Sequence, residues 1–152
     1  MKMPLDELLL CNKVEKILHQ IVLDNMYYET TICKEWLLST TCKELREKEE
    51  TIICQSYKYL YHNFSKELRE KQVSAHPGFE GYSPAVEYFG YLTMFWMFLE
   101  PKITGEEIVE YYDISEILTQ YDILHTMSNK EAIREIKENY KKVTVILDRM
   151  LH

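Results

Sequence analysis

The stretch SPAVEYFGYLTMFWMFLEP, residues 83–101, decides the fold that the sequence predicts. Almost every side chain in it is apolar, so a helix formed here is apolar on all sides and has to be buried on all sides. A membrane span needs about 20 apolar residues, whereas this run is shorter and carries Glu87 in its first turn. We therefore predict no membrane span but a central core helix over residues 84–99, with Ser83 as its N-cap and Pro84 as its first residue.

The length and composition of the chain favour a single all-α domain. It has 152 residues, of which 46% are hydrophobic and 28% charged, as in ordinary globular domains. Four glycines and four prolines are too few for the tight turns of an all-β protein of this length. We predict a compact bundle of about six to seven helices that spans residues 1–152 as one domain. The apolar spacing predicts helices at residues 5–27, 30–40, 41–71, 84–99, 105–112, 114–127 and 129–151, and a loop at 72–83.

Helix starts are marked by capping residues rather than by glycine. A Ser, Thr or Asp side chain accepts a hydrogen bond from a free amide of the first helical turn, and a Glu three positions later often accompanies it. Four such pairs predict helix starts: Thr41 with Glu44, Thr104 with Glu107, Asp113 with Glu116, and Ser128 with Glu131.

Negative charge is concentrated in the middle of the chain. The net charge is −7, and residues 73–128 contain nine acidic side chains but one basic side chain, Lys102. No Lys or Arg follows it until Lys130, so these carboxylates lack the lysine partners that a helix normally offers four residues away. Such a face either keeps the protein soluble or docks a partner. Interleaved tyrosines favour a docking surface, at about residues 104–125, for a basic partner protein. The predicted contact residues are Glu106, Glu107, Glu110, Tyr111, Tyr112, Asp113, Glu116 and Tyr121.

The leading hypothesis is therefore a non-catalytic, regulatory module that binds another protein. Binding to nucleic acid is not expected, because it requires clustered Lys and Arg to neutralise phosphates. The most basic part of the chain, residues 129–152, has six basic side chains and four acidic ones, which leaves no basic patch.

Two other hypotheses stay open. A helical domain that binds a small molecule or catalyses a reaction would use an aromatic pocket on the central helix, walled by Tyr91, Phe95 and Trp96. A structural homodimer would use the heptad seam of the last predicted helix, although this seam is short and favours packing within its own bundle. The seam residues are Ile133, Ile136, Tyr140, Val143 and Leu147.

The sequence contains no motif that names a reaction, a cofactor or a metal. It has no phosphate-binding glycine loop, no nucleophile elbow and no zinc-binding helix. Asp122 and His125 form a single carboxylate–imidazole pair, which is too few ligands for a metal site. The four cysteines lack the C-x-x-C spacing of zinc sites, and the first residues lack the features of a signal peptide. We expect a cytoplasmic protein with reduced, buried thiols and no cofactor.

Overall fold

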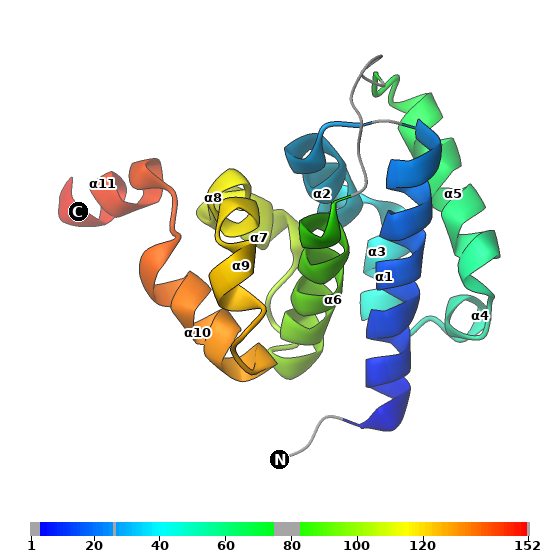
Figure 1. Ribbon diagram of the computed structural model, residues 1–152, viewed down its shortest axis with the longest axis horizontal. Helices are drawn as coiled ribbons and strands as arrows, with labels where there is room; N and C mark the ends of the chain where they lie inside the picture. The colour runs from blue at the N-terminus through cyan, green and yellow to red at the C-terminus, as the bar shows by residue number, and fades with distance from the viewer. Residues whose placement is uncertain (1–3, 26, 75–82, 152) are drawn as a thin grey trace.

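The structure, a computed structural model, describes residues 4–25, 27–74 and 83–151, and within these ranges it is all-α, as predicted (Figure 1). Each of the seven predicted segments is helical, but three of them are divided into shorter helices. The helices of the described ranges are α1 (Leu5–Asn25), α2 (Glu29–Leu38), α3 (Thr40–Arg46), α4 (Glu50–Ile53), α5 (Tyr57–Glu70), α6 (Pro84–Leu99), α7 (Gly105–Tyr111), α8 (Ile114–Thr119), α9 (Tyr121–Leu124), α10 (Asn129–Asn139) and α11 (Val143–Leu151).

The predicted central helix is α6, and its bounds are the predicted ones. It contacts α1, α2, α3, α8 and α10, while α5 packs on the far side of α1 (Figure 1). Eleven of its residues are buried, Trp96 completely. The burial is not complete on every side, because Glu87, Tyr88 and Tyr91 form a half-buried stripe at successive turns. This stripe is where the core helix reaches the surface.

The predicted long helix over residues 41–71 is wrong, because the chain breaks twice within it. Helix α3 ends at Arg46, and Lys48, just after its C-cap, has a φ of 55° in the left-handed region. The amide of Lys48 donates to the carbonyl of Leu45 at 3.1 Å, and that of Glu49 donates to Glu44 at 3.0 Å, which is the Schellman pattern usually found at glycine. After the short α4, Ser56 begins α5 by accepting a hydrogen bond from the amide of Tyr59. No glycine or proline marks either break.

The predicted cap of that helix is also wrong. Ser39, not Thr41, caps α3, because its hydroxyl accepts from the amide of Cys42 at 3.1 Å. The hydroxyl of Thr41 instead donates to the carboxylate of Glu67 at 2.6 Å. Glu67 lies in α5 and also accepts from the amides of Thr40 and Thr41, at 2.6 and 3.1 Å. A carboxylate from another helix therefore neutralises the positive end of α3.

Ser83 occupies the N-cap position of α6, as predicted, but its side chain makes no capping hydrogen bond. The caps predicted at Thr104, Asp113 and Ser128 are confirmed. The side chain of Thr104 accepts from the amide three residues later at 3.1 Å, that of Asp113 at 3.0 Å and that of Ser128 at 3.2 Å. These residues begin α7, α8 and α10. The segment 114–127 forms α8 and α9 rather than one helix. Most of the predicted loop at 72–83 lies outside the described residues.

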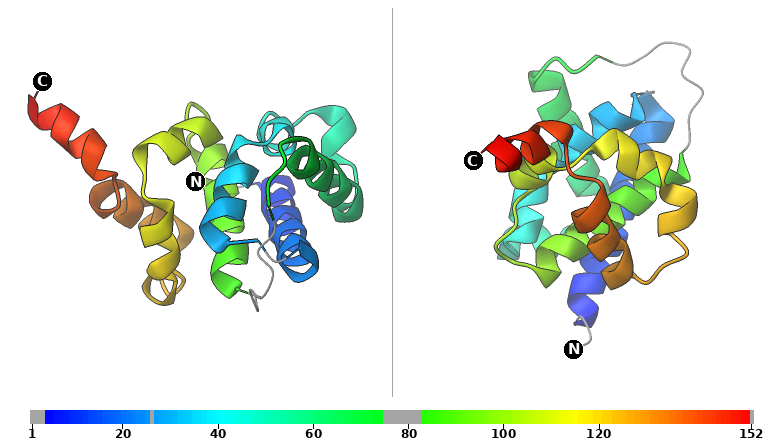
Figure 2. Two further views of the ribbon diagram at one scale, coloured as in Figure 1. Left: turned by 90° about the horizontal axis from the view of Figure 1, so that it is seen from above. Right: turned by 90° about the vertical axis from the view of Figure 1, so that its left-hand side faces the viewer.

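The predicted final helix, residues 129–151, is likewise wrong, because it is interrupted between α10 and α11. At this point the carbonyl of Tyr140 accepts from the amide of Asp113, and the amide of Lys142 donates to the carbonyl of Tyr111, both at 2.9 Å. This antiparallel bridge satisfies backbone groups left free where α7 ends and α8 begins. Helix α11 consequently projects from the bundle, and none of its side chains is buried (Figure 2).

A search of the described helices finds none that is long and apolar enough to cross a membrane. The longest, α1, is amphipathic, and the most apolar, α6, has 16 residues. Both contribute to one continuous cluster of buried apolar side chains that extends from α1 to α10.

Candidate functional site

The predicted acidic residues lie on α7 and α8, and most of them are exposed. Glu107 is the half-buried exception, and its carboxylate accepts from the hydroxyl of Thr104 at 3.2 Å. Tyr111 is 39% exposed, so its ring is available beside the carboxylates. We call the exposed set on these two helices the acidic surface; it consists of Glu106, Glu110, Tyr111, Asp113 and Glu116.

The carboxylates of the acidic surface have no ion-pair partner among the described residues. Elsewhere on the described part of the protein, some acidic side chains are paired with lysines and others are not. Lys48 lies 2.6 Å from Glu7, Lys71 lies 2.9 Å from Glu35, and Lys137 lies 2.6 Å from Glu100. The clustered carboxylates of α7 and α8 therefore lack such pairs, although the bridge at Tyr112 brings the backbone of Lys141 and Lys142 beside the end of α7.

Two of the predicted contact tyrosines do not lie on this surface. Tyr112 is only 7% exposed, and its ring packs edge-on against Trp96 with a centroid distance of 5.0 Å. Burial, partly offset by the positive charges of Lys137 and Arg149, raises the pKa of its hydroxyl. Tyr121 is half buried in α9 and faces α6 instead. Tyr112 is thus part of the core, and Tyr121 belongs to a different site.

That different site is a pocket of about 470 Å³ between α1, α6, α9 and the start of α10. We call it the tyrosine pocket. It brings the half-buried stripe of α6 together with residues that lie far away in the sequence. Its lining consists of Glu15, Pro84, Glu87, Tyr88, Tyr91, Tyr121, His125 and Asn129.

Two carboxylates from neighbouring helices, Glu15 of α1 and Glu87 of α6, line the tyrosine pocket. Burial, and after it the negative charge of Glu87, raise the pKa of Glu15, while His19 and Lys16 lower it by less. Glu87 has a side chain only 15% exposed, and its Oε1 atom lies 3.1 Å from Nδ1 of His19. Its Oε2 atom is buried and accepts no hydrogen bond from a described residue. The pocket therefore contains two carboxylates and neither Lys nor Arg in its wall, with the imidazole of His19 beside one of the carboxylates.

Aromatic rings form the rest of the wall. Tyr88 and Tyr121 meet edge to face with centroids 5.4 Å apart, and Tyr121 stacks on His125 at 4.5 Å with an interplanar angle of 18°. The hydroxyl of Tyr88 donates to the carbonyl of Leu124 at 3.0 Å, and burial raises its pKa to about 12. These contacts hold the rings of α6 and α9 in fixed orientations.

The residues predicted for an aromatic pocket are only partly brought together. Tyr91 lines the tyrosine pocket, whereas Phe95 and Trp96 are buried in the core at 6% and 0% exposure. The predicted site residues do not include Glu15, Glu87 or Asn129. A signal for Glu87 and Tyr88 was present, because the sequence EYFGY places polar atoms on one side of an otherwise apolar helix.

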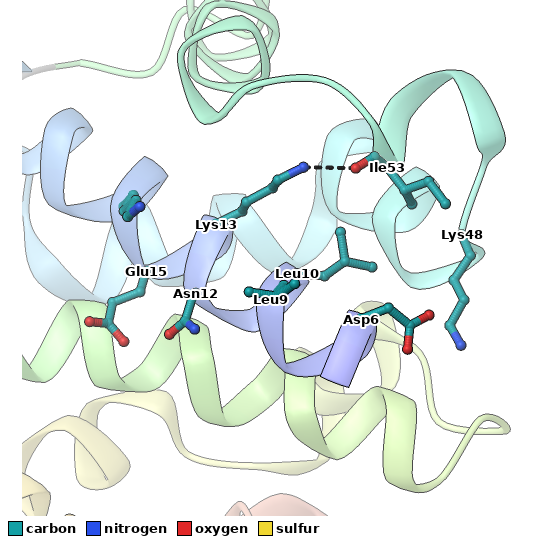
Figure 3. A pocket seen from close by; sticks show the side chains of 9 residues that line it. Asp6, Leu9, Leu10, Asn12, Lys13, Glu15, Lys48 and Ile53 are labelled. Carbon is teal, nitrogen blue, oxygen red and sulfur yellow. Dashed lines mark hydrogen bonds between the residues drawn. The ribbon is translucent and has the colours of Figure 1, made fainter. Parts of the chain in front are cut away.

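A second hollow of about 550 Å³ lies across α1, on the side of α4 (Figure 3). Leu9, Leu10 and Ile53 supply its apolar wall. Figure 3 shows Lys13 pointing from α1 to Ile53, while Glu15 points away on the other side of the helix. The amine of Lys13 donates to two carbonyls and that of Lys48 binds Glu7, so these charged groups are already engaged.

The remaining candidates from the sequence are the pair of Asp122 and His125 and the heptad seam. His125 is exposed, with Nδ1 2.8 Å from the carbonyl of Tyr121, and Asp122 is exposed beside it. The described residues hold no group of three or more side chains that could bind a metal ion. In the heptad seam, Ile133 and Ile136 are buried in the core, whereas Val143 and Leu147 are exposed on α11. A contact between copies through all five seam residues would require the first two to leave the core.

Cysteines 11, 33 and 42 are buried and free, whereas Cys54 is exposed and its thiol donates to the carbonyl of Glu50. Burial raises the pKa of the three buried thiols, that of Cys11 to about 12. Thiols with so high a pKa are poor nucleophiles and poor metal ligands, so these three are packing groups.

The chain is thus an all-α protein that combines an unpaired acidic surface with a pocket of tyrosines and carboxylates. Comparisons with protein-family models, with curated proteins and with solved structures found no match. Fold and side-chain arrangement alone therefore support the functional proposals below.

Proposed function

We propose that this chain is a non-catalytic, regulatory module that binds a basic partner protein through its acidic surface. The observation that supports this most is the cluster of exposed carboxylates on α7 and α8, which makes no ion pair within the described structure, whereas some carboxylates on other helices are paired with lysines. Unpaired carboxylates repel one another, and lysines or arginines of a partner relieve that repulsion on binding.

The shape of the surface supports the same proposal. Glu106 and Glu110 are exposed one turn apart on α7, so a basic segment lying along this helix meets both carboxylates. The exposed ring of Tyr111 adds apolar contact area beside them.

The three buried, free thiols support a location in the reducing cytoplasm.

The experiment is an affinity capture from host lysate with three forms of the purified protein. The first is the wild type, and the second carries Glu106→Lys with Glu110→Lys, whose side chains make no contact that the fold requires. The third reverses the same charge at two exposed positions elsewhere, Glu70→Lys with Glu138→Lys. We expect a basic protein that the first and third forms retain and the second loses.

Salt provides an independent check on the same capture. Because screening shortens the range of charge attraction to about 10 Å at 0.1 M salt, the partner is expected to be shed as salt rises. A partner retained equally by all three forms would show that the acidic surface only maintains solubility.

A further inference from the structure

We propose that the tyrosine pocket binds an organic ammonium group. This site goes beyond the acidic surface, because its walls come from α1, α6, α9 and α10 rather than from α7 and α8. Its volume of about 470 Å³ lies within the range of about 300–1,000 Å³ typical of small-ligand sites.

The charges of the lining select a cation over an anion. Glu15 and Glu87 are the acidic side chains of the wall, and neither Lys nor Arg lines it. The imidazole of His125 also lines the wall, and that of His19 lies 3.1 Å from Oε1 of Glu87. Glu87 keeps one oxygen, Oε2, buried without a hydrogen-bond donor from the described residues. A cationic head placed in the pocket beside the two carboxylates offsets their negative charge and relieves their repulsion.

The aromatic walls select an organic cation over a metal ion. Ring faces attract ammonium groups through their quadrupole, and cages of several aromatic side chains are the usual way in which proteins bind alkylated ammonium groups. Three tyrosines line the pocket, and Tyr88 and Tyr121 are held edge to face at 5.4 Å. A metal ion would need three or more ligating side chains, and the described residues form no such group.

Two kinds of ligand could bring an ammonium group into the pocket. A lysine side chain, plain or methylated, would extend from a peptide into the pocket, whereas a small amine such as choline would enter whole. Both present a cationic nitrogen on an alkyl chain, and both therefore use the same carboxylates and rings.

The test is a titration of the full, isotope-labelled chain, followed by NMR of the backbone amides at Glu87, Tyr88 and Asn129. The probes are choline, acetyl-lysine-methylamide, its trimethyl-lysine counterpart, and 3,3-dimethylbutan-1-ol, which has the shape of choline without its charge. We expect at least one ammonium probe to bind about tenfold or more tightly than the neutral alcohol, as cation–π attraction in a partly desolvated site implies.

Substitutions test whether the tyrosine pocket binds its ligand independently of the acidic surface. Glu87→Gln and Tyr121→Leu are each expected to weaken the ammonium probe about tenfold, and Tyr121→Leu does so while it preserves the apolar area of the wall. Circular dichroism shows whether each variant keeps its helices. The double variant Glu106→Lys with Glu110→Lys serves as the control and is expected to bind the probe normally, whether or not it loses the basic partner.

Each result of the titration either supports one source of the ligand or overturns the inference. Binding of choline but not of the lysine compounds supports a small free amine as the ligand, and the reverse supports a lysine side chain. Equal affinity for the ammonium probe and the neutral alcohol would overturn the inference, because the pocket would then recognise apolar shape alone. Absence of binding by every ammonium probe would overturn it as well.

Discussion

The ammonium group of Lys13 in α1 lies 2.7 Å from the carbonyl oxygen of Ile53 and donates a hydrogen bond to it across 40 residues of sequence. It also donates to the carbonyl of Gln55 at 2.9 Å. Both carbonyls lie at the end of α4, where helical carbonyls lack partners and the helix dipole is negative. Lys13 therefore fastens the turn that divides α4 from α5 onto α1.

Replacing this lysine should loosen that turn. Lys13→Met keeps the alkyl chain but removes both hydrogen bonds, and we expect the free energy of unfolding to fall by about 1.5–3 kcal/mol, as for hydrogen bonds of a charged group. Urea denaturation measures the loss. Lys16→Met is the matched control, because that exposed amine lies over the ring of Tyr57 at 5.7 Å and should cost less than about 1 kcal/mol. Equal losses would contradict the role given to Lys13.

Glu67 should act as a cap of α3 although it belongs to α5. Glu67→Gln retains the shape of the side chain but removes the negative charge from the start of α3 and replaces one acceptor oxygen by a donor. We expect a loss of about 2 kcal/mol in the free energy of unfolding, because charged hydrogen bonds to two amides and a hydroxyl are weakened. Thermal unfolding of Glu70→Gln, at an exposed position of the same helix, should show almost no change. If both variants behaved alike, Glu67 would not cap α3.

Gly105 should not tolerate even a methyl group. A Cβ atom at this buried position would overlap the backbone carbonyl oxygen of Leu37 in α2, and a backbone atom cannot turn aside. We expect Gly105→Ala to cost about 3 kcal/mol or to prevent folding, at the upper end of overpacking effects. At Gly90 the overlap is with the side chain of Leu18, which can change rotamer, so Gly90→Ala should cost less. Calorimetry of the two variants tests whether Gly105→Ala loses more stability than Gly90→Ala. A larger loss of stability for Gly90→Ala would contradict this prediction.

Gln72 should be improved by glycine. This exposed residue has a φ of 57° at the end of α5, and its amide donates to Arg69 in the same Schellman pattern that ends α3. We expect Gln72→Gly to raise the free energy of unfolding by about 0.5–1 kcal/mol, because the left-handed conformation is unfavourable for residues with a Cβ. Gln72→Ala, which keeps the Cβ, should give no gain in guanidinium denaturation. A gain from alanine as large as that from glycine would mean that the side chain, and not the backbone, is responsible.

Glu15 should reduce stability at neutral pH. Its pKa is raised in the folded state, first by burial and then by Glu87, so the folded protein binds this proton more tightly than the unfolded chain does. Stability therefore falls as pH rises from the usual carboxyl pKa through the raised one. Glu15→Gln should be more stable than the wild type at pH 7 and lose this advantage below the usual carboxyl pKa. Denaturation curves across this pH range test it, and an advantage that persisted in acid would exclude the carboxylate charge as its cause.

Much of the fold is predictable because its signals are local. The apolar run at residues 84–99 could only be a buried helix, and the bounds of α6 are the predicted ones. Thr104, Asp113 and Ser128 cap helices because each side chain reaches an amide three residues away, within one turn of the same segment. The excess of carboxylates between Lys102 and Lys130 is visible in the sequence for the same reason.

The sequence by itself thus determined the helical class, the central helix, most helix starts and the acidic segment, because each depends on neighbours within a few positions. The tertiary structure alone showed where the long helices break, with Lys13 bonded to the turn between α4 and α5 and the bridge from Tyr112 to Lys141 lying between α10 and α11. It alone decided that Tyr112 is core and that Glu15 joins Tyr91 in one pocket. The physical reason is that packing brings together groups from helices far apart in the chain. The spacing of apolar residues within one helix does not identify the helix against which it packs.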